Sequence, residues 1–122
     1  MHNIKKKILV TDDDPAILEV ITMILEDAGY EVKTIDNQNT EKYAEEYLPD
    51  AILLDIWMGG VDGRNICKKL KSKKNTAHIP IIIISANKDT EMIAKAAGAD
   101  GYIKKPFELN DILVLVKKIT TT

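Results

Sequence analysis

The sequence lacks the features that mark several protein classes. One cysteine, Cys67, occurs in 122 residues, so no disulfide can form within the chain, which suits a reducing compartment. No apolar run approaches the ~18 residues that cross a bilayer, and the polar segment Met1 to Lys7 is not a secretory signal. The net charge is -2, which gives no strong field for nucleic acid or an anionic membrane. We therefore expect one cytoplasmic domain that contacts neither nucleic acid nor membrane directly.

Short runs of apolar or β-branched residues predict the strands. Ile8–Val10, Ala51–Leu54 and Ile81–Ile84 are continuous apolar runs, which is typical of strands that are buried on both faces. Tyr30–Ile35 and Gly101–Ile103 contain more polar residues, so we expect them at the edges of a sheet. Each run is short and is followed by a turn signal, which favours strands over helices.

Helices are predicted between these strands, because apolar residues recur there at spacings of three and four. Asp14 and Pro15 suit the start of the first helix, and Gly29 and Gly98 suit the ends of two helices. The expected helices cover residues 16–28, 40–48, 64–73, 89–97 and 108–119, the last with Leu109, Ile112, Leu113 and Val116 on one face. This alternation of strands and helices indicates an α/β fold with a parallel sheet covered on both faces.

Polar residues follow the expected strands at one common edge of the sheet. They are Asp12 and Asp13, Asp55, Ser85 and Lys105. Each alone also fits a helix cap, a turn or a surface position. Together, three carboxylates repel one another, and a hard cation such as Mg²⁺ relieves that repulsion. With Mg²⁺ on Asp12 and Asp13, Asp55 remains as a nucleophile that can form an acyl phosphate, while Lys105 and Ser85 bind phosphoryl oxygens.

Histidine is scarce, and its positions argue against nucleophilic catalysis with a built-in general base. His2 lies in the N-terminal segment and His78 precedes the strand at 81–84, so neither falls near the acidic edge in the sequence. We find no Ser/His or Cys/His arrangement of the kind that activates a hydrolase nucleophile.

The sequence resembles the receiver domain of bacterial two-component response regulators. The matching stretches are ILVTDDDP at 8–15, DAILLD at 50–55, DG at 62–63, IIISA at 82–86 and GADGYIKKPF at 98–107, in order and over essentially the whole chain. The resemblance implies a flavodoxin-like (βα)5 fold with strand order 2-1-3-4-5. It also implies that residues 1–122 form one receiver domain without an output domain, and that the Lys105–Pro106 peptide bond is cis.

The resemblance implies a phosphorylation site at Asp55. The phosphoryl group would come from the phosphohistidine of a sensor histidine kinase or a histidine phosphotransfer protein. Asp12, Asp13 and Asp55 would bind Mg²⁺ together with the backbone carbonyl of Trp57. Beyond its own phosphorylation and slow autodephosphorylation, the domain would catalyse nothing and act as a switch.

The resemblance also assigns a switching surface. Ser85 would be the switch hydroxyl, Lys105 the phosphate-binding lysine, and Tyr102 the aromatic residue that moves inward when Ser85 turns toward the phosphate. The affected face comprises the helix at 89–97, the strand at 101–103 and the helix at 108–119. We expect it to bind a downstream protein or a second copy of the chain.

Two positions depart from the family pattern. Gly59-Gly60 stands where the family usually has Pro-Gly, which predicts a looser loop. Trp57 stands where many relatives carry a polar side chain. We hypothesise that the bulky indole shields the acyl phosphate from water and prolongs the phosphorylated state.

Other classes remain as alternatives. A small phosphohydrolase of the haloacid dehalogenase type would use Asp12 and Asp14, which have the right spacing, but the Pro15-Ala16 that follows does not fit its usual pattern. A receiver-like docking module that is never phosphorylated would not need the full set of acidic residues, the hydroxyl and the lysine. A flavin-binding protein of the same fold is disfavoured, because the acidic loop after the first strand would repel the cofactor phosphate.

Overall fold

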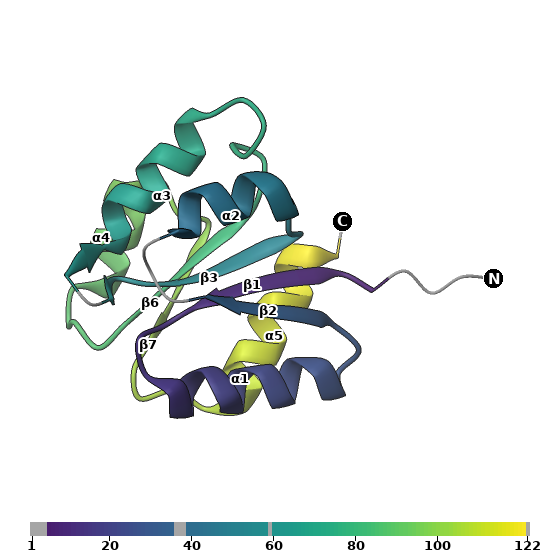
Figure 1. The fold of residues 1–122 in the computed structure, drawn as a ribbon. Helices are drawn as coiled ribbons and strands as arrows, with labels where there is room; N and C mark the ends of the chain where they lie inside the picture. The colour runs from purple at the N-terminus through teal and green to yellow at the C-terminus, as the bar shows by residue number, and fades with distance from the viewer. Residues whose placement is uncertain (1–4, 36–38, 59, 122) are drawn as a thin grey trace.

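The computed structural model describes residues 5–35, 39–58 and 60–121, which form a parallel sheet between two layers of helices (Figure 1). The strands of this sheet are β1 (Lys7–Thr11), β2 (Glu31–Ile35), β3 (Ala51–Asp55), β6 (Ile81–Ser85) and β7 (Gly101–Lys104). The helices are α1 (Pro15–Asp27), α2 (Thr40–Tyr47), α3 (Gly63–Ser72), α4 (Thr90–Ala97) and α5 (Leu109–Thr120). A short antiparallel pair, β4 (Trp57–Met58) and β5 (Val61–Asp62), lies outside the sheet.

The order of the strands confirms the predicted topology. The sheet runs β2-β1-β3-β6-β7 with every neighbouring pair parallel, which is the 2-1-3-4-5 order of a flavodoxin-like fold. Leu53 of β3 lies between Val10 of β1 and Ile82 of β6 in the register. The continuous apolar strands are therefore central, and the more polar β2 and β7 are the edges.

Each face of the sheet packs against its own set of helices. α1 and α5 lie on one side, and α2, α3 and α4 lie on the other (Figure 1). The buried core on the α1 and α5 side comprises Ile8, Val10, Ile21, Leu25, Ala51, Leu53, Ile82, Ile84, Ile103, Ile112 and Val116. The core on the other side includes Leu9, Ile52, Leu54, Ile66, Cys67, Leu70, Ile81 and Ile83. Because side chains alternate along a strand, every central strand contributes to both cores.

Local sequence signals determine where several elements begin and end. The Asp14 side chain accepts the backbone N–H of Ala16 at 3.0 Å and so caps α1, with Pro15 at its first position. Gly29 and Gly98, with φ of 99° and 81°, follow α1 and α4 in the left-handed region that glycine tolerates. The Lys105–Pro106 peptide bond is cis, as predicted.

Three expectations from the sequence need correction or restriction. The loop expected around Gly59-Gly60, from Ile56 to Gly63, contains the β4–β5 pair, and Gly59 lies outside the described residues. Leu109 is 42% exposed because it is the first residue of α5, at the end of the helix next to the strand ends. The apolar residues Met92, Ile93, Ala96 and Ala97 predict an inward face of the helix at 89–97 that includes Met92. Met92 is instead 70% exposed, because α4 buries Thr90, Ala94 and Ala97, and residues two apart do not share a helix face. In the part of the chain that the structure describes, no helix combines the length and apolarity needed to cross a membrane.

Candidate functional site

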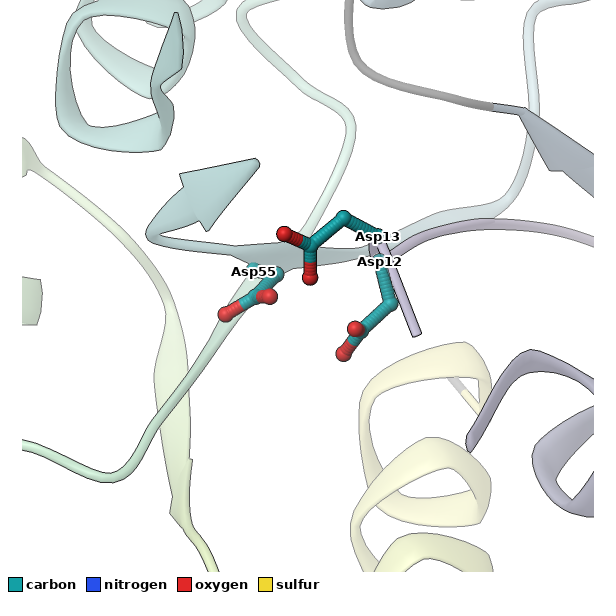
Figure 2. Close-up of side chains that lie close together, drawn as sticks. All are labelled: Asp12, Asp13 and Asp55. Carbon is teal, nitrogen blue, oxygen red and sulfur yellow. The ribbon is translucent and has the colours of Figure 1, made fainter. Parts of the chain in front are cut away.

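The carboxyl ends of β1 and β3 bring three carboxylates together. Asp55 is the last residue of β3, while Asp12 and Asp13 follow β1, which pairs with β3. One carboxylate oxygen from each residue lies within 4.8 Å of the others (Figure 2). Asp12 and Asp55 are buried, and Asp13 is exposed to solvent. The predicted cluster is therefore present at the edge of the sheet, with one side open.

The ammonium group of Lys105 contacts two of these carboxylates. Its Nζ lies 2.9 Å from Oδ2 of Asp12 and 3.5 Å from Oδ2 of Asp55. The other oxygen of Asp12, Oδ1, accepts the backbone N–H of Asp14 at 2.9 Å. The backbone N–H of Lys105 donates to the carbonyl of Ser85 at 2.8 Å, which ties the loop after β7 to the end of β6. Asp12 is thus held by two donors, whereas Lys105 is the only cation that the described residues place against Asp55.

Crowding and burial disfavour the ionised form of Asp55. Burial makes the largest contribution and, with repulsion from Asp12 and Asp13, raises the pKa of Asp55 to about 6, although Lys105 opposes the change. Burial by itself lowers the pKa of Lys105, but Asp12 and Asp55 outweigh that effect and raise it. Three carboxylates and one ammonium leave an excess of negative charge at the site.

This donor set fits Mg²⁺. Carboxylate oxygens are the protein ligands that Mg²⁺ prefers, and an open side leaves room for the waters and phosphate oxygens that complete its coordination. A cation also relieves the repulsion that raises the pKa of Asp55. Trp57, whose backbone carbonyl the family resemblance implies as a further ligand, lies two residues beyond Asp55 in β4.

The predicted switch residues lie on neighbouring strands. Ser85 is the last residue of β6, one position beyond Ile84, which pairs with Asp55. Its side chain is buried, and its Oγ accepts the backbone N–H of Asn87 at 3.0 Å. Tyr102 lies on the edge strand β7 and is 39% exposed, so it is not part of the carboxylate cluster.

Sequence reasoning missed the role of Gly63 in supporting the site. Its N–H donates to the carbonyl of Ile56 at 2.6 Å. A Cβ at this position would overlap with the carbonyl oxygen of Asp55 and lie 3.0 Å from Cα of Ile56. The start of α3 therefore packs directly against the backbone of Asp55. The Asp62-Gly63 pair was the available signal, since it combines a helix cap with the one residue type that permits such an approach.

An apolar groove of about 530 Å³ lies beside the cluster, between α1 and the loop before α5. Lys105 contributes to its lining, so the groove borders the residue whose ammonium contacts Asp12 and Asp55. The remaining lining residues are Ala16, Ile17, Val20, Ala86, Pro106, Phe107 and Leu109.

The fold and the site together define a receiver-type phosphoacceptor domain, with acidic residues and a lysine at the carboxyl edge of a flavodoxin-like sheet. The family model of the response regulator receiver domain matches residues 8–117. The chain belongs to this family. It is a receiver domain of two-component systems and acts as a signalling switch.

Curated relatives are transcriptional regulators. The DNA-binding dual master transcriptional regulator RpaA of Synechocystis sp. is 34% identical over 116 residues, which cover 93% of this chain and 48% of the relative. The alkaline phosphatase synthesis transcriptional regulatory protein PhoP of Bacillus subtilis is 38% identical over 118 residues, with coverage of 93% and 48%. The chain therefore spans about half the length of these relatives.

Solved structures share the whole fold. The chemotaxis response regulator CheY4 of Vibrio cholerae matches with a TM-score of 0.87 and 28% identity, covering 95% of this chain and 99% of that one. The receiver domain of the sensor histidine kinase PA1611 of Pseudomonas aeruginosa matches with a TM-score of 0.88 and 26% identity, covering 98% and 100%. That structure has a magnesium ion coordinated in its active site cleft.

Proposed function

We propose that Asp55 is the phosphoryl acceptor of this receiver domain and that Asp12, Asp13, Asp55 and the Trp57 carbonyl bind the Mg²⁺ that its phosphorylation requires. The observation that carries the proposal is the carboxylate cluster, with ligand oxygens within 4.8 Å of one another and Lys105 in contact with two of its members. Few structural roles would justify three crowded carboxylates at the end of a buried strand pair, because each raises the cost of ionising the others.

The chemistry follows from the positions of these groups. An ionised Asp55 oxygen attacks the phosphorus of a phosphohistidine. The new P–O bond forms an acyl phosphate as the P–N bond breaks, and its electron pair leaves on the imidazole nitrogen. Mg²⁺, when bound, neutralises negative charge on the phosphoryl oxygens. Lys105, 3.5 Å from Asp55, supplies a charge-assisted hydrogen bond to another phosphoryl oxygen, and the Ser85 hydroxyl supplies a third contact.

We further propose how the modification is transmitted. Ser85 leaves the backbone N–H of Asn87 and turns toward the phosphoryl group, and Tyr102 moves inward from its exposed position. This changes the face formed by α4, β7 and α5, which then binds a downstream protein or a second copy of the chain. RpaA, one of the relatives, is a DNA-binding regulator of about twice this length, so the expectation of no direct nucleic-acid contact concerns residues 1–122 alone.

The donor protein is a sensor histidine kinase or a histidine phosphotransfer protein, and we propose that it docks on α1. The apolar groove there includes Val20, which is 41% exposed, and extends to Lys105. A partner seated in the groove would bring its phosphohistidine to the open side of the cluster, next to Asp55.

Intact-mass measurement after incubation with acetyl phosphate tests the acceptor. We expect one phosphoryl group on the wild type, dependent on Mg²⁺, and none on Asp55→Asn. Asp27→Asn, at the exposed end of α1, is the matched control and should be modified like the wild type. Sustained hydrolysis of a phosphate ester would favour the phosphohydrolase alternative, and the absence of any adduct would favour the docking module.

A further inference from the structure

β4, which begins two residues after Asp55, is only weakly held by its own strand pairing. β4 and β5 form only two residue pairs, Trp57 with Asp62 and Met58 with Val61. Such a short antiparallel ladder is marginal without other contacts. Trp57 is 58% exposed, so its indole contributes only part of the hydrophobic stabilisation that full burial would give. A further contact at Trp57 would add to what holds this strand in place.

Arg64, in the first turn of α3, is itself held rigidly by Asp62. Its Nε donates to both carboxylate oxygens of Asp62, at 3.0 and 3.1 Å, and one Nη donates to Oδ2 at 2.8 Å. The same carboxylate caps α3 by accepting the backbone N–H of Arg64 at 2.9 Å. Because the guanidinium is planar and forked, these bonds fix its orientation as well as its position.

The fixed guanidinium lies against Trp57. Its central carbon is 5.8 Å from the centroid of the indole ring, within the range of a cation–π contact. Asp62 is also the residue opposite Trp57 in the β4–β5 pair. Trp57, Asp62 and Arg64 therefore form a closed unit, the Arg64 clamp, that joins the segment after Asp55 to the start of α3.

We propose that Arg64 is a positioning residue of the metal site, acting through Trp57. The clamp holds the β4 backbone so that the Trp57 carbonyl stays available to Mg²⁺, and this inference rests on the metal site proposed above. α3 is a suitable anchor, because Gly63 at its start packs against the backbone of Asp55. Through α3, the clamp thus fixes the position of the Trp57 carbonyl relative to Asp55, the other proposed ligand on this segment.

The test compares Mg²⁺ affinity by calorimetry in the full chain for the wild type, Arg64→Leu, Arg64→Lys and the control Lys68→Leu. Lys68 is exposed and lies one turn further along α3, so its replacement removes the same charge and leaves the Arg64 guanidinium in place. Loss of a nearby positive charge should by itself strengthen cation binding. The clamp predicts the opposite for Arg64→Leu, a weakening of about two- to fivefold, as expected for an exposed cation–π contact.

A second readout follows the clamp without Mg²⁺. Trp57 is the single tryptophan of the chain, so its fluorescence reports on this segment alone. We expect acrylamide to quench it more strongly in Arg64→Leu than in the wild type or Lys68→Leu, with Arg64→Lys in between. Thermal unfolding of each variant distinguishes a local change from a loss of folding.

The outcomes separate this inference from the proposed function. If the wild type binds Mg²⁺ and Arg64→Leu binds it as tightly as Lys68→Leu, then Arg64 merely caps α3 and the inference is overturned alone. If the wild type binds no Mg²⁺, the proposed metal site is wrong and the inference is overturned with it. If Arg64→Leu does not fold, a Mg²⁺ affinity of Arg64→Lys equal to that of the wild type contradicts the inference, and a weaker affinity supports it.

Discussion

The ammonium of Lys105 lies 3.5 Å from the carboxylate of Asp55 and makes a shorter bond, 2.9 Å, to the carboxylate of Asp12. Lys105 is thus bonded to one acid and within reach of another. If Asp55 gains a phosphoryl group, as proposed above, its negative charge increases and it competes more strongly with Asp12 for the ammonium. The lysine can then move toward the acyl phosphate without a change in the backbone, because Ser85 already fixes its N–H.

Replacement of Lys105 should slow phosphorylation. In Lys105→Met, Asp55 loses the cation that lowers its pKa, and the phosphoryl group loses a charge-assisted hydrogen bond. Bonds of this kind contribute about 1.5–3 kcal/mol, so we expect the rate with acetyl phosphate to fall about tenfold to a hundredfold. Initial rates by intact mass give the comparison, with the exposed Lys104→Met as control. Equal rates in both variants would argue against a role for Lys105.

Replacement of Asp55 should stabilise the fold above pH 6 when Mg²⁺ is absent. The folded pKa, about 6, exceeds the ordinary value of 3.8, so the folded state disfavours the ionised carboxyl. The penalty is present above pH 6 and disappears as the pH falls below about 4, because both states are then protonated. Asp55→Asn should therefore have a higher melting temperature than the wild type at pH 7.5. The corresponding gain in the free energy of unfolding is at most about 3 kcal/mol, the equivalent of a shift of roughly two pKa units.

Thermal unfolding between pH 4 and pH 8 checks this dependence. The difference in melting temperature between Asp55→Asn and the wild type should decrease as the pH falls. The melting temperature of Asp27→Asn should follow that of the wild type throughout. A gap that is constant with pH would mean that the ionisation of Asp55 does not cause it.

Gly63→Ala should destabilise the protein. The added methyl group would overlap with the carbonyl oxygen of Asp55, and backbone atoms must move to admit it. Overpacking of this kind costs about 1–3 kcal/mol, which urea titration can measure. Gly101→Ala is the matched control, because its methyl would meet Leu115 at an ordinary 3.6 Å. A loss of stability in Gly101→Ala that equals the loss in Gly63→Ala would contradict the argument.

The hypothesis that Trp57 shields the acyl phosphate predicts faster dephosphorylation in Trp57→Asn. Removal of the indole should admit water, so we expect the adduct to disappear several-fold faster, that is, with a barrier lower by about 1 kcal/mol. The decay is followed by intact mass after the phosphodonor has been removed. Trp57→Phe keeps an aromatic ring and should decay like the wild type. A rate in Trp57→Asn that does not rise would refute the shielding hypothesis.

The central architecture was predictable because its signals are strong. β3 and β6 are continuous apolar runs, and a parallel sheet brings their carboxyl ends to one edge whatever the details of packing. The meeting of Asp12, Asp13 and Asp55 follows from that geometry alone, and the structure shows it.

The remaining features depend on contacts that no local pattern encodes. Two-residue strands such as β4 and β5 are too short for alternation to be recognised. The contact of Arg64 with the Trp57 ring joins residues seven apart, through a hairpin that the sequence does not predict. Periodicity indicated one apolar face on α5, but it could not show that Leu109 lies at the end of the helix, where the core no longer covers it.

The four isoleucines of β6 can serve as NMR probes on both faces of the sheet. Ile81 and Ile83 belong to the core under α2, α3 and α4, whereas Ile82 and Ile84 belong to the core under α1 and α5. Their methyl resonances therefore sample opposite sides of the molecule at successive distances from Ser85. In isoleucine-labelled protein without any mutation, changes in these methyl chemical shifts would show which core responds to a chemical change at the site. They would also show how far from Ser85 the response extends along β6.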